Sequence, residues 1–223
     1  MSTAFFVAWG IILLGDALLM SFLTWAAHSQ RYGKYRIRNG INRITRAKKA
    51  INTQLNNLLS LCIFAAYIYY LGGSTLYAGT PRMAVLIGEV LGVLLLYDFM
   101  YYCFHRGLHH PRLMRYVHGV HHFVRNPVAD ESIYVHPAEA IGGLSLLILA
   151  IVIVGPVSTT SFLLIFLIHS TANIIVHSNL VFPHPAFRLF NFWAIKHDIH
   201  HHTVRDNYAS IFPFWDQAFG TAK

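Results

Sequence analysis

The chain has 223 residues, of which 55% are apolar and only 12% are charged. Soluble globular domains carry roughly 25% charged residues, so this composition excludes an ordinary soluble enzyme and favours an integral membrane protein. The two cysteines, Cys62 and Cys103, lie inside apolar stretches, which excludes a disulfide framework and a thiolate metal site.

The net charge of +8 comes from one short segment, residues 31–49. This basic segment has no acidic residue, and the nine basic residues elsewhere are balanced by nine acidic ones. Positive charge confined to one loop between apolar stretches is typical of a cytoplasmic loop beside a membrane rather than of a nucleic-acid surface. We therefore expect membrane lipids, and no nucleic acid, as partners. The basic residues of the segment are Arg31, Lys34, Arg36, Arg38, Arg43, Arg46, Lys48 and Lys49.

Five apolar stretches predict helices at residues 5–25, 55–71, 83–103, 140–154 and 157–176. A helix needs about 20 residues to cross the hydrocarbon of a bilayer, and three of the stretches reach that length. The two shorter stretches are each joined to a longer one by glycine and proline, at residues 72–81 and 155–156. The sequence therefore predicts an all-α integral membrane helical bundle of about four to five membrane helices, arranged as a first helix and two hairpins.

The basic segment also predicts the topology. The positive-inside rule places residues 31–49 in the cytoplasm, and each hairpin then returns the chain to the same face, whether the second hairpin spans or is re-entrant. We expect one membrane domain, 1–223, with a cytoplasmic helical cap. Its parts are N-terminal membrane helices (1–104), a first histidine-rich cap segment (105–139), a membrane hairpin (140–176) and a second histidine-rich cap segment (177–223).

Eleven of the fifteen histidines fall within residues 105–136 and 197–202. The boxes H-R-G-L-H (105–109), H-G-V-H-H (118–122) and H-D-I-H-H (197–201) repeat spacings that place imidazoles on one helix face. Three such boxes on one side of a membrane favour a metal site over separate solvated histidines or a pH switch. None has the glutamate of the zinc-hydrolase motif H-E-x-x-H, and imidazoles suit iron, copper, zinc or nickel.

The number of histidines predicts two ions. The three boxes supply eight imidazoles, and His177, the first polar residue after the last apolar stretch, supplies a ninth. One octahedral ion takes at most six ligands. Asp98 lies two helical turns before His105, so we expect its carboxylate to orient a ligand imidazole.

The three boxes resemble those of the fatty acid hydroxylase/sterol desaturase superfamily of integral-membrane diiron oxygenases. The H-P-A-E at 136–139, the H-S-N at 177–179 and the run N-Y-A-S-I-F-P-F-W-D-Q-A-F-G-T at 207–221 extend the resemblance over about residues 95–222. The H-P-x-E and closing motifs are most similar to the C4-methylsterol oxidase branch.

The resemblance implies a diiron centre and O2-dependent attack on a C–H bond of a lipid. Asp98, Asp198 and Glu139 are the carboxylates expected around the centre, and His136, His169 and His202 are further candidate ligands. Some members carry an aspartate two or three residues before the residue equivalent to His177, where this chain has Ile175, with Asn173 nearby. The histidines that match the family's ligand boxes are His105, His109, His118, His121, His122, His177, His197, His200 and His201.

The function expected on this basis is hydroxylation of a sterol or fatty-acyl lipid in lipid biosynthesis, with two iron ions and O2. Desaturation on the same metal site is the alternative, because the position of the substrate decides between the two products. A metal transporter fits less well, since transporters place ligands at the bilayer midplane and the boxes lie outside the apolar stretches. Zinc can replace iron in the purified protein, because the Irving–Williams order favours it.

We expect a separate electron donor, such as a cytochrome b5 or a ferredoxin, because the chain has no G-x-G-x-x-G dinucleotide motif and no H-P-G-G haem signature. Arg112, Arg115 and Arg125, beside the boxes, are candidates to contact this acidic partner or lipid phosphates. The active site is expected on the cytoplasmic side of a bacterial inner membrane or of the eukaryotic endoplasmic reticulum. Aromatic candidates for a substrate tunnel or an interfacial belt are Tyr101, Tyr102, Phe104, Trp193, Phe214 and Trp215.

Overall fold

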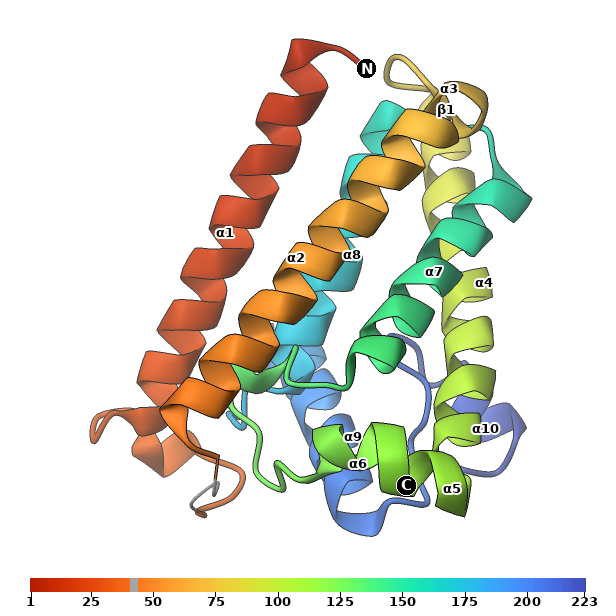
Figure 1. Cartoon of the computed structure of the whole chain (residues 1–223). Coiled ribbons are helices and arrows are strands. Elements are labelled where there is room, and N and C mark those ends of the chain that lie inside the picture. The colour runs from red at the N-terminus through yellow and green to blue at the C-terminus, as the bar shows by residue number, and fades with distance from the viewer. Residues whose placement is uncertain (41–43) are drawn as a thin grey trace.

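The computed structural model describes residues 1–40 and 44–223, so that Arg43 of the basic segment lies outside the described residues. Long helices form the body of the molecule and run between its two ends (Figure 1). They are α1 (Thr3–His28), α2 (Arg46–Tyr70), α4 (Met83–Leu108), α7 (Pro137–Val154) and α8 (Thr159–Val176).

Short elements connect these helices and build one end of the molecule. The turns hold η1 (Gly33–Tyr35), α3 (Gly72–Thr75), η3 (Ala129–Glu131) and η4 (Pro185–Phe187). Two short strands, β1 (Leu76–Tyr77) and β2 (Val157–Ser158), pair in parallel and join the turns of the two hairpins. The cap consists of α5 (Pro111–Leu113), η2 (Met114–His118, a π-helix), α6 (Gly119–His122), α9 (Arg188–Thr203) and α10 (Phe214–Ala218).

Side-chain caps fix where several long helices begin. Ser2, Thr45 and Ser158 each precede a helix, and their hydroxyl groups accept a backbone N–H of its first turn. Pro137 starts α7, where a missing N–H costs nothing. Helix boundaries are therefore set locally, before any packing is considered.

Four helices, α1, α4, α7 and α8, are long and apolar enough to cross a membrane. This confirms the predicted all-α membrane bundle. The helix α2 begins nine residues before its apolar stretch, with Arg46, Lys48 and Lys49 in its first turn. One face of its polar first half packs against the protein: Lys49 Nζ lies 2.7 Å from Asp130 Oδ2.

The two helical hairpins, α2 with α4 and α7 with α8, pack against each other. The helix α7 packs against both α2 and α4, α4 also packs against α8, and α8 packs against α1. An aromatic cluster connects the outer helices α1 and α2 to α8; most of its rings meet edge to face or tilted, and those of Tyr67 and Phe162 are stacked. This cluster consists of Phe5, Trp9, Phe64, Tyr67, Phe162 and Phe166.

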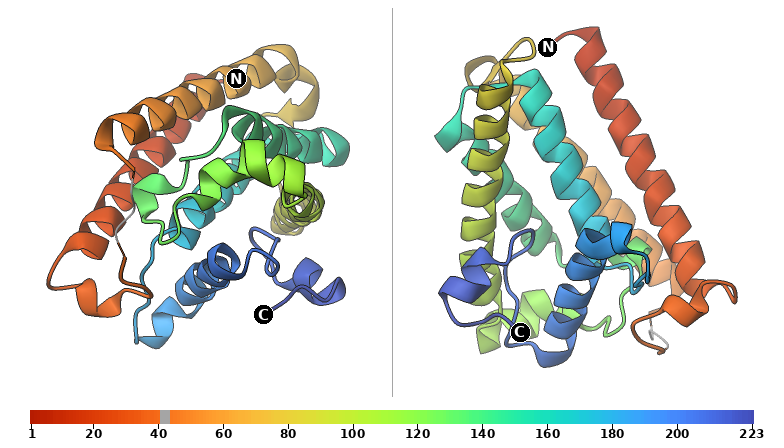
Figure 2. Two further views of the ribbon diagram at one scale, coloured as in Figure 1. Left: turned by 60° about the horizontal axis from the view of Figure 1, so that its bottom comes forward. Right: turned by 180° about the vertical axis from the view of Figure 1, so that it is seen from behind.

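Both histidine-rich segments lie at the same end of the bundle, as predicted. Seen with that end forward, α5 and α6 lie beside the end of α4, with α9 and α10 next to them (Figure 2). The basic segment reaches this end too, because residues 35–38 pair with residues 179–181 through a backbone bridge between Arg36 and Leu180. The side of the membrane that this end faces stays a prediction.

Candidate metal centre

Helix ends and short helices bring the predicted ligand histidines together. His105 lies in the last turn of α4, and His109 directly follows that helix. His177 directly follows α8. The second box ends η2 and fills α6, and the third box lies in the last turns of α9. All nine predicted ligands therefore come from elements of the cap or from helix ends that meet it (Figure 2).

The nine imidazoles form two groups, and within each group the ring nitrogens lie within 4.8 Å of one another. The second and third boxes are divided between the groups, and the first box lies wholly in the first group. The two histidines of each i, i+4 pair belong to the same group. In the second and third boxes, the histidine between them belongs to the other group. The first group is His105, His109, His118, His122 and His200; the second is His121, His177, His197 and His201.

The spacing of the nitrogens fits metal ions. In the first group, Nε2 of His118 lies 3.0 Å from Nε2 of both His105 and His122. In the second, neighbouring Nε2 atoms lie 2.9 to 3.4 Å apart. Imidazole nitrogens bind a first-row ion at about 2.1 Å, so donors at right angles around one ion lie about 3.0 Å apart.

The tautomers of the imidazoles also favour metal binding. Three rings use Nδ1 against a backbone carbonyl, which can only accept, so their Nδ1 carries the hydrogen and Nε2 carries a lone pair. Lone pairs cannot hydrogen-bond to one another, and Nε2 of His109 is buried with no hydrogen-bond partner among the described residues. A cation in each group would satisfy these nitrogens. The three contacts are His105 to Tyr208 (2.7 Å), His177 to Asn173 (2.8 Å) and His200 to Asp206 (2.7 Å).

Burial keeps the imidazoles in the neutral form that binds metal. Removal from water lowers the pKa of His109 to about 4, that of His122 to about 3 and that of His177 to about 4. Burial also lowers the pKa of His118, and the neighbouring imidazoles lower it further. At neutral pH the two groups therefore offer lone pairs rather than positive charge.

One of the three predicted carboxylates touches the cluster. Glu139 Oε1 lies 2.9 Å from Nδ1 of His118, and both side chains are buried. The Glu139 carboxylate is therefore placed to orient this ring and to offset positive charge on a bound ion.

The other two carboxylates have different partners, and the expectation that they face ligand imidazoles is wrong. Asp98 accepts the backbone N–H groups of residues 210–212, at 2.7 to 3.0 Å. Asp198 pairs with Arg38 of the basic segment, with Nε 3.0 Å from Oδ2. Asp98 shares a helix face with His105, but its oxygens accept from residues 210–212, while Nδ1 of His105 donates to the carbonyl of Tyr208.

The three further candidate ligands lie outside both groups. His136 caps α7 by accepting the N–H of Ala138. Nε2 of His169 lies 3.0 Å from the hydroxyl of Tyr97, and Nδ1 of His202 donates to the carbonyl of Asp198. Each therefore has a partner that accounts for its position.

Main-chain carbonyls are the part of the site that the sequence analysis missed. The carbonyl of Tyr208 comes from the closing motif, that of Asp206 lies directly before this motif, and that of Asn173 lies one turn before His177. No side-chain pattern identifies a carbonyl acceptor, although the closing motif marks the segment that supplies one of them.

A cavity of about 150 Å³ reaches both groups of histidines. It lies among α2, α4, α7 and α8, and its wall includes His105 of the first group and His121, His177 and His197 of the second. Of the six aromatic residues predicted to line a tunnel, only Tyr101 lines this cavity. The candidate metal site therefore borders a cavity inside the helix bundle.

A sequence model of the family described as fatty acid hydroxylase matches residues 90–221. The chain belongs to this family. The match covers the histidine boxes and the closing motif, and it leaves α1 and α2 outside.

Relatives carry several activity names. The chain is 36% identical over 144 residues to methylsterol monooxygenase 1 of Gallus gallus, covering 63% of this chain and 48% of that protein. It is 34% identical over 152 residues to a very-long-chain aldehyde decarbonylase of Oryza sativa, covering 64% and 55%. It is 31% identical over 169 residues to fatty acid hydroxylase ahd1 of Mycosarcoma maydis, covering 74% and 43%. The chain thus spans about half the length of these relatives, and no solved structure matches it.

Proposed function

We propose that the protein is an O2-dependent lipid C–H hydroxylase whose nine histidines hold two iron ions. The observation that carries this proposal is the cavity, whose wall contains imidazoles of both groups and which lies among apolar helices. Membership of the fatty acid hydroxylase family supports oxidative lipid chemistry. The names of the relatives favour a sterol or a fatty-acyl chain as substrate.

The chain's own residues would bind and orient the reactants. When bound, the irons would supply the activation of O2 and the removal of hydrogen from an unactivated carbon. The helices around the cavity hold an apolar chain and exclude water. Glu139, through its contact with His118, keeps one imidazole in place.

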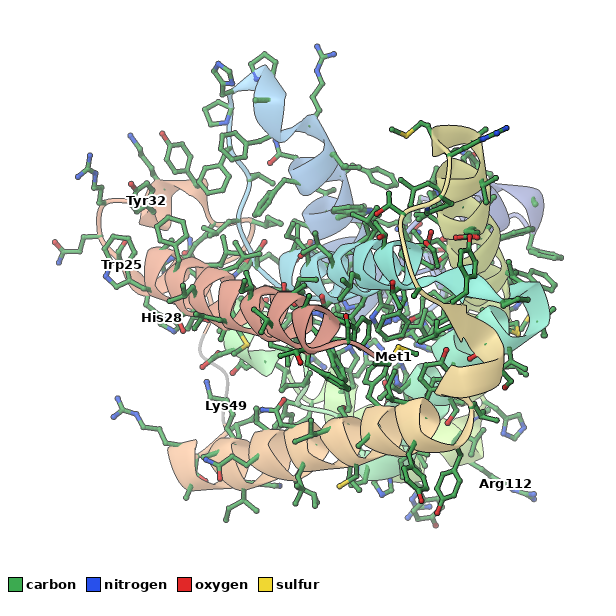
Figure 3. The ribbon with its side chains drawn as sticks, turned by 90° about the horizontal axis from the view of Figure 1, so that it is seen from above. Met1, Trp25, His28, Tyr32, Lys49 and Arg112 are labelled. Atoms are coloured by element: carbon green, nitrogen blue, oxygen red, sulfur yellow. The ribbon has the colours of Figure 1, made fainter. Side chains whose placement is uncertain are left out.

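Electrons would come from a separate carrier, such as a cytochrome b5 or a ferredoxin. Arg112, Arg115 and Arg125 are exposed on the cap, where an acidic carrier or lipid phosphates would meet them. Figure 3 shows Arg112 at the opposite edge of the molecule from Tyr32 and Lys49. Arg125 lies closer to the basic segment, because the ring of Phe123, two residues before it, lies 5.9 Å from Lys48 Nζ. With the cap in the cytoplasm, the site would lie on the cytoplasmic side of a bacterial inner membrane or of the endoplasmic reticulum, where it could meet such a carrier.

Lipidomics of a host that expresses the protein tests this function. We expect a lipid that gains one oxygen atom, only when O2 is present, and no such product from His118→Ala or His201→Ala, one variant for each group. A lipid that loses two hydrogens would instead show desaturation. An unchanged lipid profile, with two irons bound and a donor supplied, would contradict both reactions.

A further inference from the structure

The cavity wall contains a polar side chain that neither the sequence motifs nor the metal centre explains. Asn56 lies on α2, outside the residues that match the family, and it is 1% exposed. It lines the cavity together with Ser60, one turn later on the same helix face. The cavity thus has a polar region on the wall formed by α2.

Hydrogen bonds fix the orientation of the Asn56 amide. Its Nδ2 donates to the carbonyls of Ile133 and Val135, both at 3.0 Å, and to Asn52 Oδ1 at 3.2 Å. Because a carbonyl can only accept, the nitrogen must face residues 133–135. The oxygen, Oδ1, therefore occupies the other side of the amide.

This oxygen is buried and has no hydrogen-bond partner in residues 1–40 and 44–223. Buried polar atoms without a partner are rare and costly. Glu139 Oε2, in the same cavity wall, is a second buried acceptor without a partner in that part of the chain. Both residues line the cavity, and a hydrogen-bond donor bound there would satisfy these oxygens.

The surroundings restrict what carries that donor. The cavity lies beside the candidate membrane helices α4, α7 and α8, so a ligand that enters it from the bilayer has an apolar body. An ester, an aldehyde or an ether offers only acceptors and would leave Oδ1 unpaired. A hydroxyl group can donate to Asn56 Oδ1 and accept from a neighbouring hydroxyl such as that of Ser60.

We propose that Asn56 is a specificity-determining residue that accepts a hydrogen bond from the hydroxyl group of a lipid alcohol. The inference rests on the proposed function, and it narrows the substrate class to hydroxyl-bearing lipids, whether sterols or long-chain alcohols. The hydroxyl is held at the α2 wall, so that a carbon elsewhere on the lipid faces His105, His121, His177 and His197.

Binding to the purified, metal-loaded protein tests this role. The dissociation constants of cholesterol and 1-hexadecanol are compared with those of cholest-5-ene and hexadecane, which lack the hydroxyl. We expect at least a tenfold preference for one alcohol over its hydrocarbon, and the preferred pair distinguishes a sterol from a straight chain. In Asn56→Ala the preference should disappear, while hydrocarbon affinity is unchanged. Asn56→Leu, which keeps the volume, gives the same test if the alanine variant does not fold.

Asn52→Ala is the matched control, because Asn52 also donates to the carbonyl of Val135 but does not line the cavity. The variant removes one acceptor of Asn56 Nδ2 and leaves the carbonyls of Ile133 and Val135 to orient the amide. It should keep the preference for the alcohol. Equal loss in the Asn52 and Asn56 variants would show that Asn56 only anchors residues 133–135. Equal binding of alcohol and hydrocarbon by the unmodified protein would show that water satisfies Oδ1. Either result overturns the proposal. Asn56-dependent binding without any oxidised product would leave this inference standing and contradict the proposed function.

Discussion

Main-chain carbonyls and one carboxylate hold the imidazoles in orientation. His105, His177 and His200 each donate Nδ1 to a carbonyl, while His118 faces Glu139. A carbonyl fixes the tautomer and leaves the charge of the site unchanged, whereas the Glu139 carboxyl group can offset the charge of a bound ion. The two kinds of partner therefore do different work, and changing them should have different effects.

Replacing Glu139 by alanine should weaken metal binding. The variant removes the only carboxylate beside an imidazole of either group among the described residues, and loss of such a partner costs roughly 10- to 100-fold in affinity. Metal competition with a chelator measures the change. Asp198→Asn is the control, because Asp198 lies inside the third box but faces Arg38. Equal weakening by both substitutions would contradict the assignment.

The metal-free protein should lose stability as the pH falls below about 6.5. Burial lowers the pKa of His109 and His177 to about 4 and that of His122 to about 3. Between those values and about 6.5, the unfolded chain binds protons that the folded chain does not, so acid favours unfolding. Melting temperatures in detergent from pH 7.5 to 4.5 should be level above pH 6.5 and fall below it. A melting temperature that rises with acidification would refute this linkage.

The spacing of the histidines predicted that each i, i+4 pair would share a helix face, but it did not predict that His121 and His200 would join the other group. All nine meet in two groups, and their binding of metal stays a prediction. The carboxylates were harder to predict. Asp98 lies on the same helix face as His105, but its carboxylate accepts hydrogen bonds from backbone N–H groups of residues 210–212, which are distant in sequence.

At the level of elements, the loop between α9 and α10 contributes contacts to the candidate metal centre. Asp98 anchors residues 210–212 on α4, and Lys196 Nζ donates to the carbonyls of Ala209 and Phe212. The same loop supplies the carbonyl of Tyr208 to His105. The loop thus connects α4 and α9, which carry histidines of different boxes.

Asp98→Ala should loosen this loop. It leaves three backbone N–H groups without their acceptor, a loss of about 3 kcal/mol or more in the free energy of unfolding. Hydrogen exchange should accelerate over residues 207–213, and the melting temperature should fall. Asp98→Asn, which keeps one acceptor oxygen, should lie between the alanine variant and the unmodified protein. Unchanged exchange in the alanine variant would show that the loop is held by other contacts.

Apolar stretches predicted the long helices well, because length and hydrophobicity alone decide whether a helix can cross a bilayer. They failed at the start of α2, whose first turns are polar. Those turns are stabilised by contacts such as Lys49 with Asp130 and Asn52 with the carbonyl of Val135. Such tertiary contacts cannot be found by a hydropathy pattern.

For the whole molecule, the arrangement of the helices places both cap segments and the basic segment at one end. The turn after β1 lies at the other end, near the N-terminus (Figure 1). Only the charge of the basic segment indicates which end faces the cytoplasm.

Labelling from either side of the membrane tests this orientation. In a chain with Cys62→Ser and Cys103→Ser, thiols introduced by Arg112→Cys and Arg31→Cys should react with an impermeant maleimide from the cytoplasmic side. A thiol from Ala78→Cys, in the exposed turn after β1, should react only from the opposite side. Labelling of positions 31 and 112 from different sides would contradict the shared cap.

The metal content of the purified chain tests the central claim most directly. The two groups predict two transition-metal ions per chain, counted by mass spectrometry of the metal against the protein concentration. His118→Ala and His201→Ala, which each remove a ligand from one group, should bind fewer than two. His184→Ala, whose ring caps η4, should still bind two. One ion per chain, or two ions that neither ligand variant reduces, would contradict the dimetal centre.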